Sequence, residues 1–270
     1  MSAAGDIGHP SRRVRPFRGI RRSARRWGRR LGIRLGLLPG PADRGYVICA
    51  TARSGSTYLC QLLASTGQLG KPIEYFNTRA RRKDTDPNYP EEPRAQLDIV
   101  RSMGATPNGI YAVKVMPWQY SRANKKIDVF RDLPNLNFVR LRRRDLLGQA
   151  ISVARVQQTG QFIASQQPRR KAVYDAEGIR SCLLAVQARE SAWDRTMLEF
   201  GVQPLTFEYE DVMRDPQGAV DHVAALMGLA ALPPIDPALV HVAVLRSRET
   251  DEWRRRFLAD TGEEFRHLAF

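Results

Sequence analysis

A short loop of small and hydroxyl residues carries the clearest chemical signal in this sequence. Residues 50–57 read Ala-Thr-Ala-Arg-Ser-Gly-Ser-Thr and lie between an apolar run and a segment with helical spacing. Backbone amides at the start of a helix, together with hydroxyl groups and a fixed positive charge, can surround a phosphate. The residues that would supply these groups are Arg53, Ser54, Gly55, Ser56 and Thr57. By itself the loop indicates an anion site no more strongly than a plain turn between strand and helix.

The loop differs from the P-loop that binds magnesium and a nucleoside triphosphate. That motif, GxxxxGK[ST], requires a first glycine where Ala50 or Thr51 stands and a lysine where Ser56 stands. We also find no predicted strand that ends in the carboxylate such enzymes need. The loop therefore favours an anion site without metal, and a P-loop phosphotransferase or nucleotide hydrolase is the weaker enzymatic alternative.

A second basic group follows another apolar run. Residues 136–141 lead directly into Arg142, Arg143 and Arg144, and Ser152 stands eight positions after Arg144. An arginine at the end of a strand and a serine in the next helix can converge on one phosphate. Two anion sites in one domain suggest a bisphosphorylated adenosine as ligand. A solvated arginine cluster and an ordinary helix serine are the alternatives.

The hydrophobic pattern places these residues on alternating strands and helices. Apolar runs with β-branched residues predict strands, and apolar residues three or four apart predict helices. The expected strands cover residues 46–50, 110–116, 136–141 and 203–207, and the expected helices cover residues 57–66, 93–103, 146–158, 178–200 and 211–227. Residues 71–93 should form an irregular excursion. The pattern predicts an α/β fold, a three-layer α/β/α sandwich with a parallel P-loop-type sheet, whose ligands bind beyond the carboxyl ends of the strands.

Charge divides the chain into two parts. The chain has 270 residues and a formal net charge of +15, and its arginines recur most densely between Arg12 and Arg44. We therefore expect a basic N-terminal tail, residues 1–43, that could contact anionic surfaces, and one catalytic domain, residues 44–270. The domain has the charge balance of an ordinary enzyme, so we expect no specific nucleic acid partner. A basic nucleic-acid-binding protein is the non-enzymatic alternative.

Cysteine content and hydropathy favour the cytoplasm. Cys49, Cys60 and Cys182 form no CxxC pair and leave an odd number, so we expect no disulfide framework. No run approaches the roughly 18 apolar residues that a membrane helix needs. Import into an organelle stays open for a eukaryotic source, because the start of the chain is rich in arginine.

Three ordered blocks resemble the superfamily of sulfotransferases that use 3′-phosphoadenosine 5′-phosphosulfate (PAPS). The blocks are Arg-Ser-Gly-Ser-Thr-Tyr at residues 53–58, Arg144 with Ser152, and Phe-Glu-Tyr-Glu-Asp-Val at residues 207–212. Further segments resemble the bacterial trehalose 2-sulfotransferase family, at residues 49–57, 72–76, 113–116, 149–152 and 158–160. This resemblance spans most of the predicted domain.

The resemblance implies PAPS as co-substrate, no metal, and transfer to a hydroxyl group of a carbohydrate, either trehalose or a related glycolipid headgroup. It assigns the 5′-phosphosulfate to Arg53–Thr57, with Arg53 on the leaving charge, and the 3′-phosphate to Arg144 and Ser152. It also implies a homodimer. A related fold that binds the ligand without turnover would share the same motifs.

Glu74 matches the glutamate that serves as general base in the trehalose enzymes. Sulfuryl transfer resembles phosphoryl transfer, in which an alcohol attacks in line and a nearby base takes its proton. Many sulfotransferases use a histidine, but the histidines of this chain, His9, His222, His241 and His267, lie outside the expected positions. Without the resemblance, Glu74 would be an exposed carboxylate or an ion-pair partner of Lys71 or Arg79.

Other residues are weaker candidates for the site. Lys114 is the only charge in its apolar run and could reach the transferred group or extend from the strand end. The candidate stacking surfaces are Tyr58, Trp118, Trp193 and Trp253, although such aromatic residues usually belong to the core. Arg246 and Arg248 could close over the 3′-phosphate, but the glycines of the usual motif are missing around them.

Overall fold

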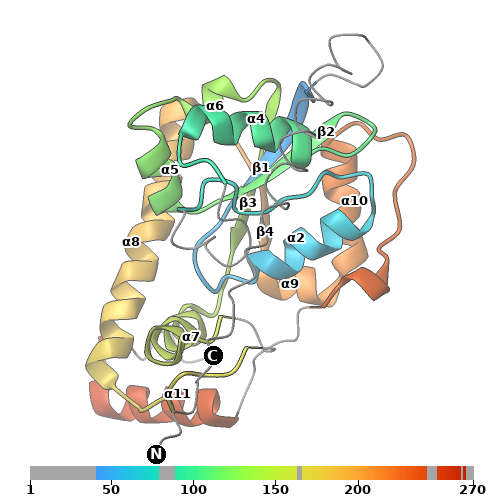
Figure 1. Ribbon diagram of the computed structural model, residues 1–270. Helices are drawn as coiled ribbons and strands as arrows, with labels where there is room; N and C mark the ends of the chain where they lie inside the picture. The colour runs from blue at the N-terminus through green and yellow to red at the C-terminus, as the bar shows by residue number, and fades with distance from the viewer. Residues whose placement is uncertain (1–40, 79–88, 163–165, 242–247, 263, 266–270) are drawn as a thin grey trace, which may run out of the picture. The chain divides into compact units, whose positions relative to one another are not determined.

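A parallel sheet of four strands organises the computed structural model (Figure 1). The structure describes residues 41–270 except 79–88, 163–165, 242–247, 263 and 266–270. The strands are β1 (Arg44–Cys49), β2 (Ile110–Val115), β3 (Leu136–Arg142) and β4 (Leu205–Glu208). All neighbouring pairs are parallel, in the order β2-β1-β3-β4. The predicted α/β class and parallel sheet are confirmed, with strand boundaries that differ by up to two residues.

The strand order explains why the two predicted anion segments lie close together. The chain passes from β1 to β2 on one side, then returns to β3 on the other side of β1. Ligands of open α/β sheets bind at such a reversal, beyond the carboxyl ends of the two central strands. Cys49, the last residue of β1, pairs with Arg140 near the end of β3. The loops after β1 and β3 therefore open onto the same edge of the sheet.

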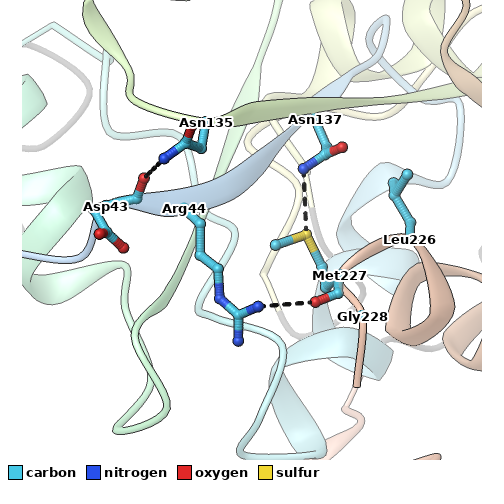
Figure 2. A pocket seen from close by; sticks show the side chains of 7 residues that line it. All are labelled: Asp43, Arg44, Asn135, Asn137, Leu226, Met227 and Gly228. Carbon is cyan, nitrogen blue, oxygen red and sulfur yellow. Dashed lines mark hydrogen bonds between the residues drawn. The ribbon is translucent and has the colours of Figure 1, made fainter. Parts of the chain in front are cut away.

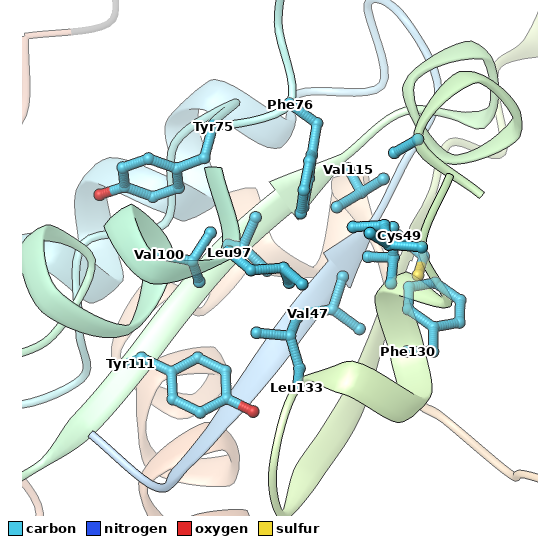
Figure 3. Packing of buried hydrophobic residues seen from close by; sticks show 14 of the residues in the cluster. Val47, Cys49, Tyr75, Phe76, Leu97, Val100, Tyr111, Val115, Phe130 and Leu133 are labelled. Atoms are coloured by element: carbon cyan, nitrogen blue, oxygen red, sulfur yellow. The ribbon is translucent and has the colours of Figure 1, made fainter. Parts of the chain in front are cut away.

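Helices cover both faces of the sheet and form the outer layers of the predicted sandwich (Figure 1). Alternate residues of β1 point to opposite faces, so that Val47 and Cys49 enter one core, while Tyr46 and Ile48 enter the other. Figure 3 shows the first core, where Val47 packs near Leu133. Its helices are α4 (Pro93–Met103), α5 (Pro117–Ala123), α6 (Val129–Asp132) and α8 (Ala176–Phe200). The opposite core is covered by α2 (Ser56–Ser65), α9 (Tyr209–Arg214) and α10 (Pro216–Leu226).

A third core forms away from the sheet. It joins α7 (Leu146–Thr159), the first half of α8 and α11 (Arg248–Thr261), and Trp253 and Phe257 of α11 are buried there. The second half of α8 packs against the sheet instead, through Trp193 and Met197. One helix of 25 residues therefore belongs to two cores, and residue Glu190 lies where they meet. The sequence pattern did not predict α11, α5 or α6. A short 3₁₀ turn, η1 (Pro237–Leu239), precedes α11.

The single helix predicted over residues 211–227 is wrong. The chain forms α9 and α10 with a break at Asp215, whose φ and ψ are −134° and 78°. The cause is Pro216, because proline lacks an N–H group and disfavours helical geometry in the residue before it. Asp215 then caps α10, since its Oδ1 accepts a hydrogen bond of 2.9 Å from the Gly218 amide.

The excursion predicted over residues 71–93 is more regular than expected where it is described. Ile73 forms a parallel bridge with Val113, and the Lys114 amide donates to the Ile73 carbonyl over 3.0 Å. On the same side of β2, the Ala112 amide donates to the Gly104 carbonyl over 3.1 Å. Since β2 lies at one end of the strand order, these contacts cover an otherwise open edge of the sheet.

The predicted tail, residues 1–43, lies outside the described residues except for its last three. Among those, Ala42 is buried, and its amide and carbonyl are both hydrogen-bonded to Arg101 of α4. Cys49, Cys60 and Cys182 are buried and form no disulfide. In the part of the chain that the structure describes, no helix has the length and apolar character to cross a membrane.

We predict that Asp215→Ala lowers the free energy of unfolding by about 1 kcal/mol, because α10 loses its N-terminal cap. Urea denaturation followed by circular dichroism measures this change. The control is Asp98→Ala on the exposed surface of α4, where no cap is removed. Equal midpoints for the two variants would show that the Asp215 cap contributes nothing.

Candidate active site

The loop between β1 and α2 has an unusual backbone. Arg53 and Gly55 both have positive φ, at 62° and 87°. A side chain at Gly55 would be excluded, because an added Cβ would lie 2.1 Å from Cδ2 of Tyr209. A non-glycine residue in the left-handed region costs on the order of 1 to 3 kcal/mol and persists only where its surroundings fix it. The loop around Arg53 must therefore be held by strong contacts.

A buried ion pair supplies the first of these contacts. Arg140 of β3 and Glu190 of α8 are 2% and 6% exposed, and the guanidinium group bonds directly to the carboxylate. The same carboxylate accepts a 2.6 Å hydrogen bond from the hydroxyl group of Thr51. Arg140 also donates to the carbonyl of Cys49, at the end of β1. The start of the loop is thus held by two charged side chains that are almost fully buried.

Two neutral side chains complete this support. Nε1 of Trp193 donates to the carbonyl of Ala50 over 3.0 Å. The Gln149 amide of α7 donates to the Thr51 hydroxyl over 2.9 Å and to the Ala52 carbonyl over 2.7 Å. Helices α7 and α8 therefore determine the path of the chain from Ala50 to Ala52.

The side chain of Arg53 points to α7 and the segment that follows it. Its Nε donates to the Ser152 hydroxyl over 2.9 Å, and one terminal nitrogen donates to the Phe162 carbonyl over 2.7 Å. Burial lowers the pKa of Arg53, and the nearby Arg143 guanidinium lowers it further. An anion placed beside Arg53 would relieve both effects, because opposite charge favours the protonated form.

Glu74 lies near Thr57, the last residue of the loop, and forms an ion pair with Lys114. Oε1 of Glu74 is 3.1 Å from Nζ of Lys114, and this ammonium group is 3.4 Å from the Thr57 hydroxyl. Lys114 is 6% exposed and Thr57 is exposed. Lys114 is therefore a partner of Glu74, whereas Arg79, one of the partners considered from the sequence, lies outside the described residues.

The other carboxylate oxygen of Glu74 is held by two amides. Its Oε2 accepts a 2.7 Å hydrogen bond from Nε2 of Gln119 and a 3.2 Å hydrogen bond from Nδ2 of Asn77. Gln119 is 1% exposed, and its own Oε1 accepts from the Met116 amide at the start of α5. The carboxylate is thus oriented by a buried residue on the helix that follows β2.

The structure gives Arg144 and Ser152 different partners. Arg144 is half exposed and pairs with Asp211 of α9, while Ser152 bonds to Arg53. Their convergence on one phosphate stays a prediction, because in the structure each of the two side chains is bonded to another residue of the protein. The other two arginines are also paired, Arg142 with Glu190 and Arg143 with Asp145. A phosphate that binds this cluster must compete with carboxylates.

A cleft of about 1140 Å³ opens beside this cluster, beyond the carboxyl ends of β3 and β4. Its wall mixes charges: the basic members are Arg142, Arg143, Arg144 and Arg254, and the acidic members are Asp145, Glu190, Asp194, Glu208, Glu210 and Asp251. Figure 2 shows a second hollow at the opposite end of the sheet, where Arg44 donates to the Met227 carbonyl over 3.3 Å. Of these two hollows, only the first lies at the carboxyl ends of the strands, as does the loop of residues 50–57 (the anion loop).

The four aromatic residues considered as stacking surfaces differ in how far they are buried. Trp193 and Trp253 are 1% and 3% exposed and belong to the cores. Trp118 is 36% exposed, with the Arg189 guanidinium 5.7 Å from its ring centre. Tyr58 is partly buried and packs against the core of α2 and α10. Arg246 and the side chain of Arg248 lie outside the described residues.

Comparison with known proteins places this site in a family. The sequence model of the Stf0 sulphotransferase family matches residues 45–260. The chain belongs to the Stf0 sulphotransferases. It is therefore a sulfotransferase, and the resemblance found in the sequence is confirmed.

Two curated relatives match nearly their whole length. The trehalose 2-sulfotransferase of Mycobacterium tuberculosis (strain ATCC 35801 / TMC 107 / Erdman) is 29% identical, over 81% of this chain and 96% of the relative. That of Mycolicibacterium smegmatis (strain ATCC 700084 / mc(2)155) is 27% identical, over 80% and 94%. Two solved structures, the sulfotransferase domains of the curacin biosynthetic pathway and of the Synechococcus PCC 7002 olefin synthase, are each 15% identical. Their TM-scores are 0.42 and 0.40, over 84% and 82% of this chain and 99% and 96% of theirs.

The sequence interpretation missed the residues that support this sulphotransferase site. Glu190 occupies the apolar spacing of α8, four residues after Val186 and three before Trp193, which are both buried. Arg140 interrupts the apolar run of β3 in the same way. A charge at a core position predicts a buried partner, so these two residues could have been paired from the sequence. Gln119 had no comparable signal.

We predict that Glu190→Ala lowers the free energy of unfolding by about 3 to 5 kcal/mol, because it leaves the Arg140 charge buried without a close partner. Replacing both residues, as in Arg140→Met with Glu190→Met, should cost less than the sum of the single changes. Chemical denaturation measures Glu190→Ala, the double variant, and the single variants Arg140→Met and Glu190→Met.

The matched control for this prediction is Asp194→Ala. Asp194 also lies near Arg140, at 3.9 Å, but its side chain is 53% exposed. Its loss should therefore cost less than about 1 kcal/mol. Similar losses for Glu190→Ala and Asp194→Ala would contradict the role given to the buried pair.

Proposed function

We propose that this sulfotransferase takes a sulfuryl group from PAPS and transfers it to a hydroxyl group of trehalose or a closely related carbohydrate. The observation that carries the proposal is the position of Lys114, whose ammonium group lies between the Glu74 carboxylate and the Thr57 hydroxyl. A base and a cation therefore meet at the end of an anion loop. The two curated relatives, both named trehalose 2-sulfotransferase, support trehalose as the first acceptor to test.

In this proposal the donor binds across the loop and the start of α7. Residues Arg53–Thr57 hold the 5′-phosphosulfate, and Arg144 with Ser152 hold the 3′-phosphate. The hydrogen bond between Arg53 and Ser152 supports this arrangement, because it brings one residue from each predicted phosphate site into contact. Arg144 must exchange its partner Asp211 for the phosphate, which costs little at an exposed ion pair.

The chain then supplies three functions to the transfer. Glu74 takes the proton of the acceptor hydroxyl group, Lys114 holds the carboxylate toward the loop, and Arg53 stabilises the charge that grows on the leaving phosphate. Positioned charges of this kind account for most of the catalysis in transfers with a loose transition state. The proposal needs no metal ion.

The proposal also includes a cytoplasmic enzyme that acts as a homodimer, with a basic tail that can contact anionic surfaces. Buried, unpaired cysteines are compatible with a reducing compartment. Analytical ultracentrifugation of the full chain, with and without residues 1–40, tests the oligomeric state and the role of the tail.

The proposed donor site predicts that adenosine 3′,5′-bisphosphate binds in the absence of metal. Arg53→Ala should weaken this binding by about 10-fold or more, because a charge-assisted hydrogen bond contributes roughly 1.5 to 3 kcal/mol. Isothermal titration calorimetry measures both affinities. ATP with magnesium is the control ligand and should bind poorly, since the loop lacks the P-loop lysine. A well-folded protein that does not bind the bisphosphate would refute the donor assignment.

The base assignment predicts that Glu74→Gln binds the bisphosphate normally but transfers sulfate at least about 100-fold more slowly, because general base catalysis contributes on this scale. Transfer of radioactive sulfate from PAPS to trehalose measures the rate. An active Glu74→Gln variant would mean that another group accepts the proton.

A further inference from the structure

The two oxygens of the Glu74 carboxylate have different surroundings. Oε1 faces Lys114, whose ammonium group also reaches Thr57 of the loop. Oε2 faces away from this pair and accepts hydrogen bonds from Gln119 over 2.7 Å and from Asn77 over 3.2 Å. One oxygen therefore points to the anion loop, and the other is occupied by two amide donors.

Gln119 can make this contact in only one orientation. Its Oε1 accepts a 3.0 Å hydrogen bond from the Met116 amide, while its Nε2 donates to Glu74 and, over 3.2 Å, to Oδ1 of Asn77. Turning the amide by 180° would set an oxygen against the carboxylate and an NH₂ group against an N–H donor. The burial of Gln119 makes such unpaired groups costly. The direction of the Nε2 donor is therefore fixed.

The backbone holds the same parts in register. Strand β2 carries Lys114 and leads directly into α5, which carries Gln119 at its third position. The Lys114 amide donates to the Ile73 carbonyl, so the residue before Glu74 is bonded to the same strand. The lysine, the glutamine and the carboxylate are thus positioned by the same strand.

Neutral donors on Oε2 suit a base better than a second cation would. Hydrogen bonds to the charged form favour the ionised carboxylate, but an added cation would lower its proton affinity further. Two titratable groups of the described residues that interact with Glu74 are Lys114 on β2 and Cys60 on α2. Burial raises the pKa of Cys60 to about 11, so this thiol is neutral at physiological pH and adds no charge beside Glu74.

We propose that Gln119, assisted by Asn77, is a positioning residue that holds Oε2 and thereby makes Oε1 the oxygen that accepts the proton. The inference rests on the proposed function, in which Glu74 is the base. The acceptor O–H proton passes to Oε1, and the acceptor oxygen forms a bond to sulfur. The bond between sulfur and the bridging oxygen of the donor breaks, and its electron pair stays on the leaving phosphate.

The test is the pH dependence of transfer in Gln119→Met, which keeps the side-chain length but removes the amide. We expect kcat to fall by about 10- to 100-fold, as for a misplaced catalytic group. The acidic limb of kcat/KM for trehalose should move to higher pH, because the ionised carboxylate loses a hydrogen bond. Affinity for adenosine 3′,5′-bisphosphate should change by less than about twofold, since Gln119 makes no contact with the loop in the described residues.

A matched control exists on α10. Oε1 of Gln217 accepts from the Ile235 amide over 3.1 Å, and its Nε2 donates to the Asp221 carboxylate over 2.7 Å, so it makes the same two kinds of bond away from the site. Gln217→Met should leave the rate and pH profile of transfer unchanged. If Gln119→Met shows a wild-type pH profile, the proposed role is wrong, whatever the loss in rate.

A second variant keeps the test decisive if Gln119→Met folds poorly. Gln119→Glu has the same shape but can donate to Oε2 only when its own carboxyl group is protonated. Its activity should therefore rise and then fall as the pH increases, because Glu74 must be ionised while the introduced carboxyl group stays protonated, whereas the wild type should lose activity only on the acidic side. A parallel profile would overturn the inference, whereas an active Glu74→Gln variant would overturn the base assignment itself.

Discussion

The buried ion pair between Arg140 and Glu190 is the contact on which the rest of the site depends. It joins β3 to α8 beneath the anion loop, and its carboxylate also accepts the hydroxyl group of Thr51. Charges without water interact strongly, and each requires its partner. The path of the chain before Arg53 is therefore tied to core packing, which explains how a non-glycine residue persists with a φ of 62°. The position of the loop that carries Arg53 therefore depends on this pair.

Much of the fold could be predicted because its signals are local. Apolar runs of β-branched residues predicted the four strands, and three-to-four spacing predicted α2, α4, α7 and α8 but missed α11, which has 14 residues. The loop at residues 50–57 stood out because a strand and a helix flank it. The errors also have local causes: Pro216 breaks a helix that the apolar spacing alone would continue, and α5 is too short, at seven residues, for its period to be visible.

The partners of the site residues could not be predicted in the same way. Sequence spacing suggested that Arg144 and Ser152 hold one phosphate together, but it did not suggest that Ser152 bonds to Arg53 or that Arg144 pairs with Asp211. Long side chains choose among several partners within reach, and that choice depends on how segments distant in sequence are packed. Gln119 is the clearest example, because nothing in the sequence around this short helix indicates which carboxylate its side-chain amide contacts. Types of residue were predictable, whereas their pairings required the three-dimensional structure.

The bridge between Ile73 and Val113 gives the segment that carries Glu74 a second role, as cover for the edge of the sheet. Exposed strand edges offer free amide and carbonyl groups to other chains and promote aggregation. The segment that carries Glu74 occupies part of the edge of β2, so a deletion there would uncover this edge while displacing the carboxylate. A change of length in residues 71–74 would therefore disturb the sheet edge and the position of Glu74 at the same time.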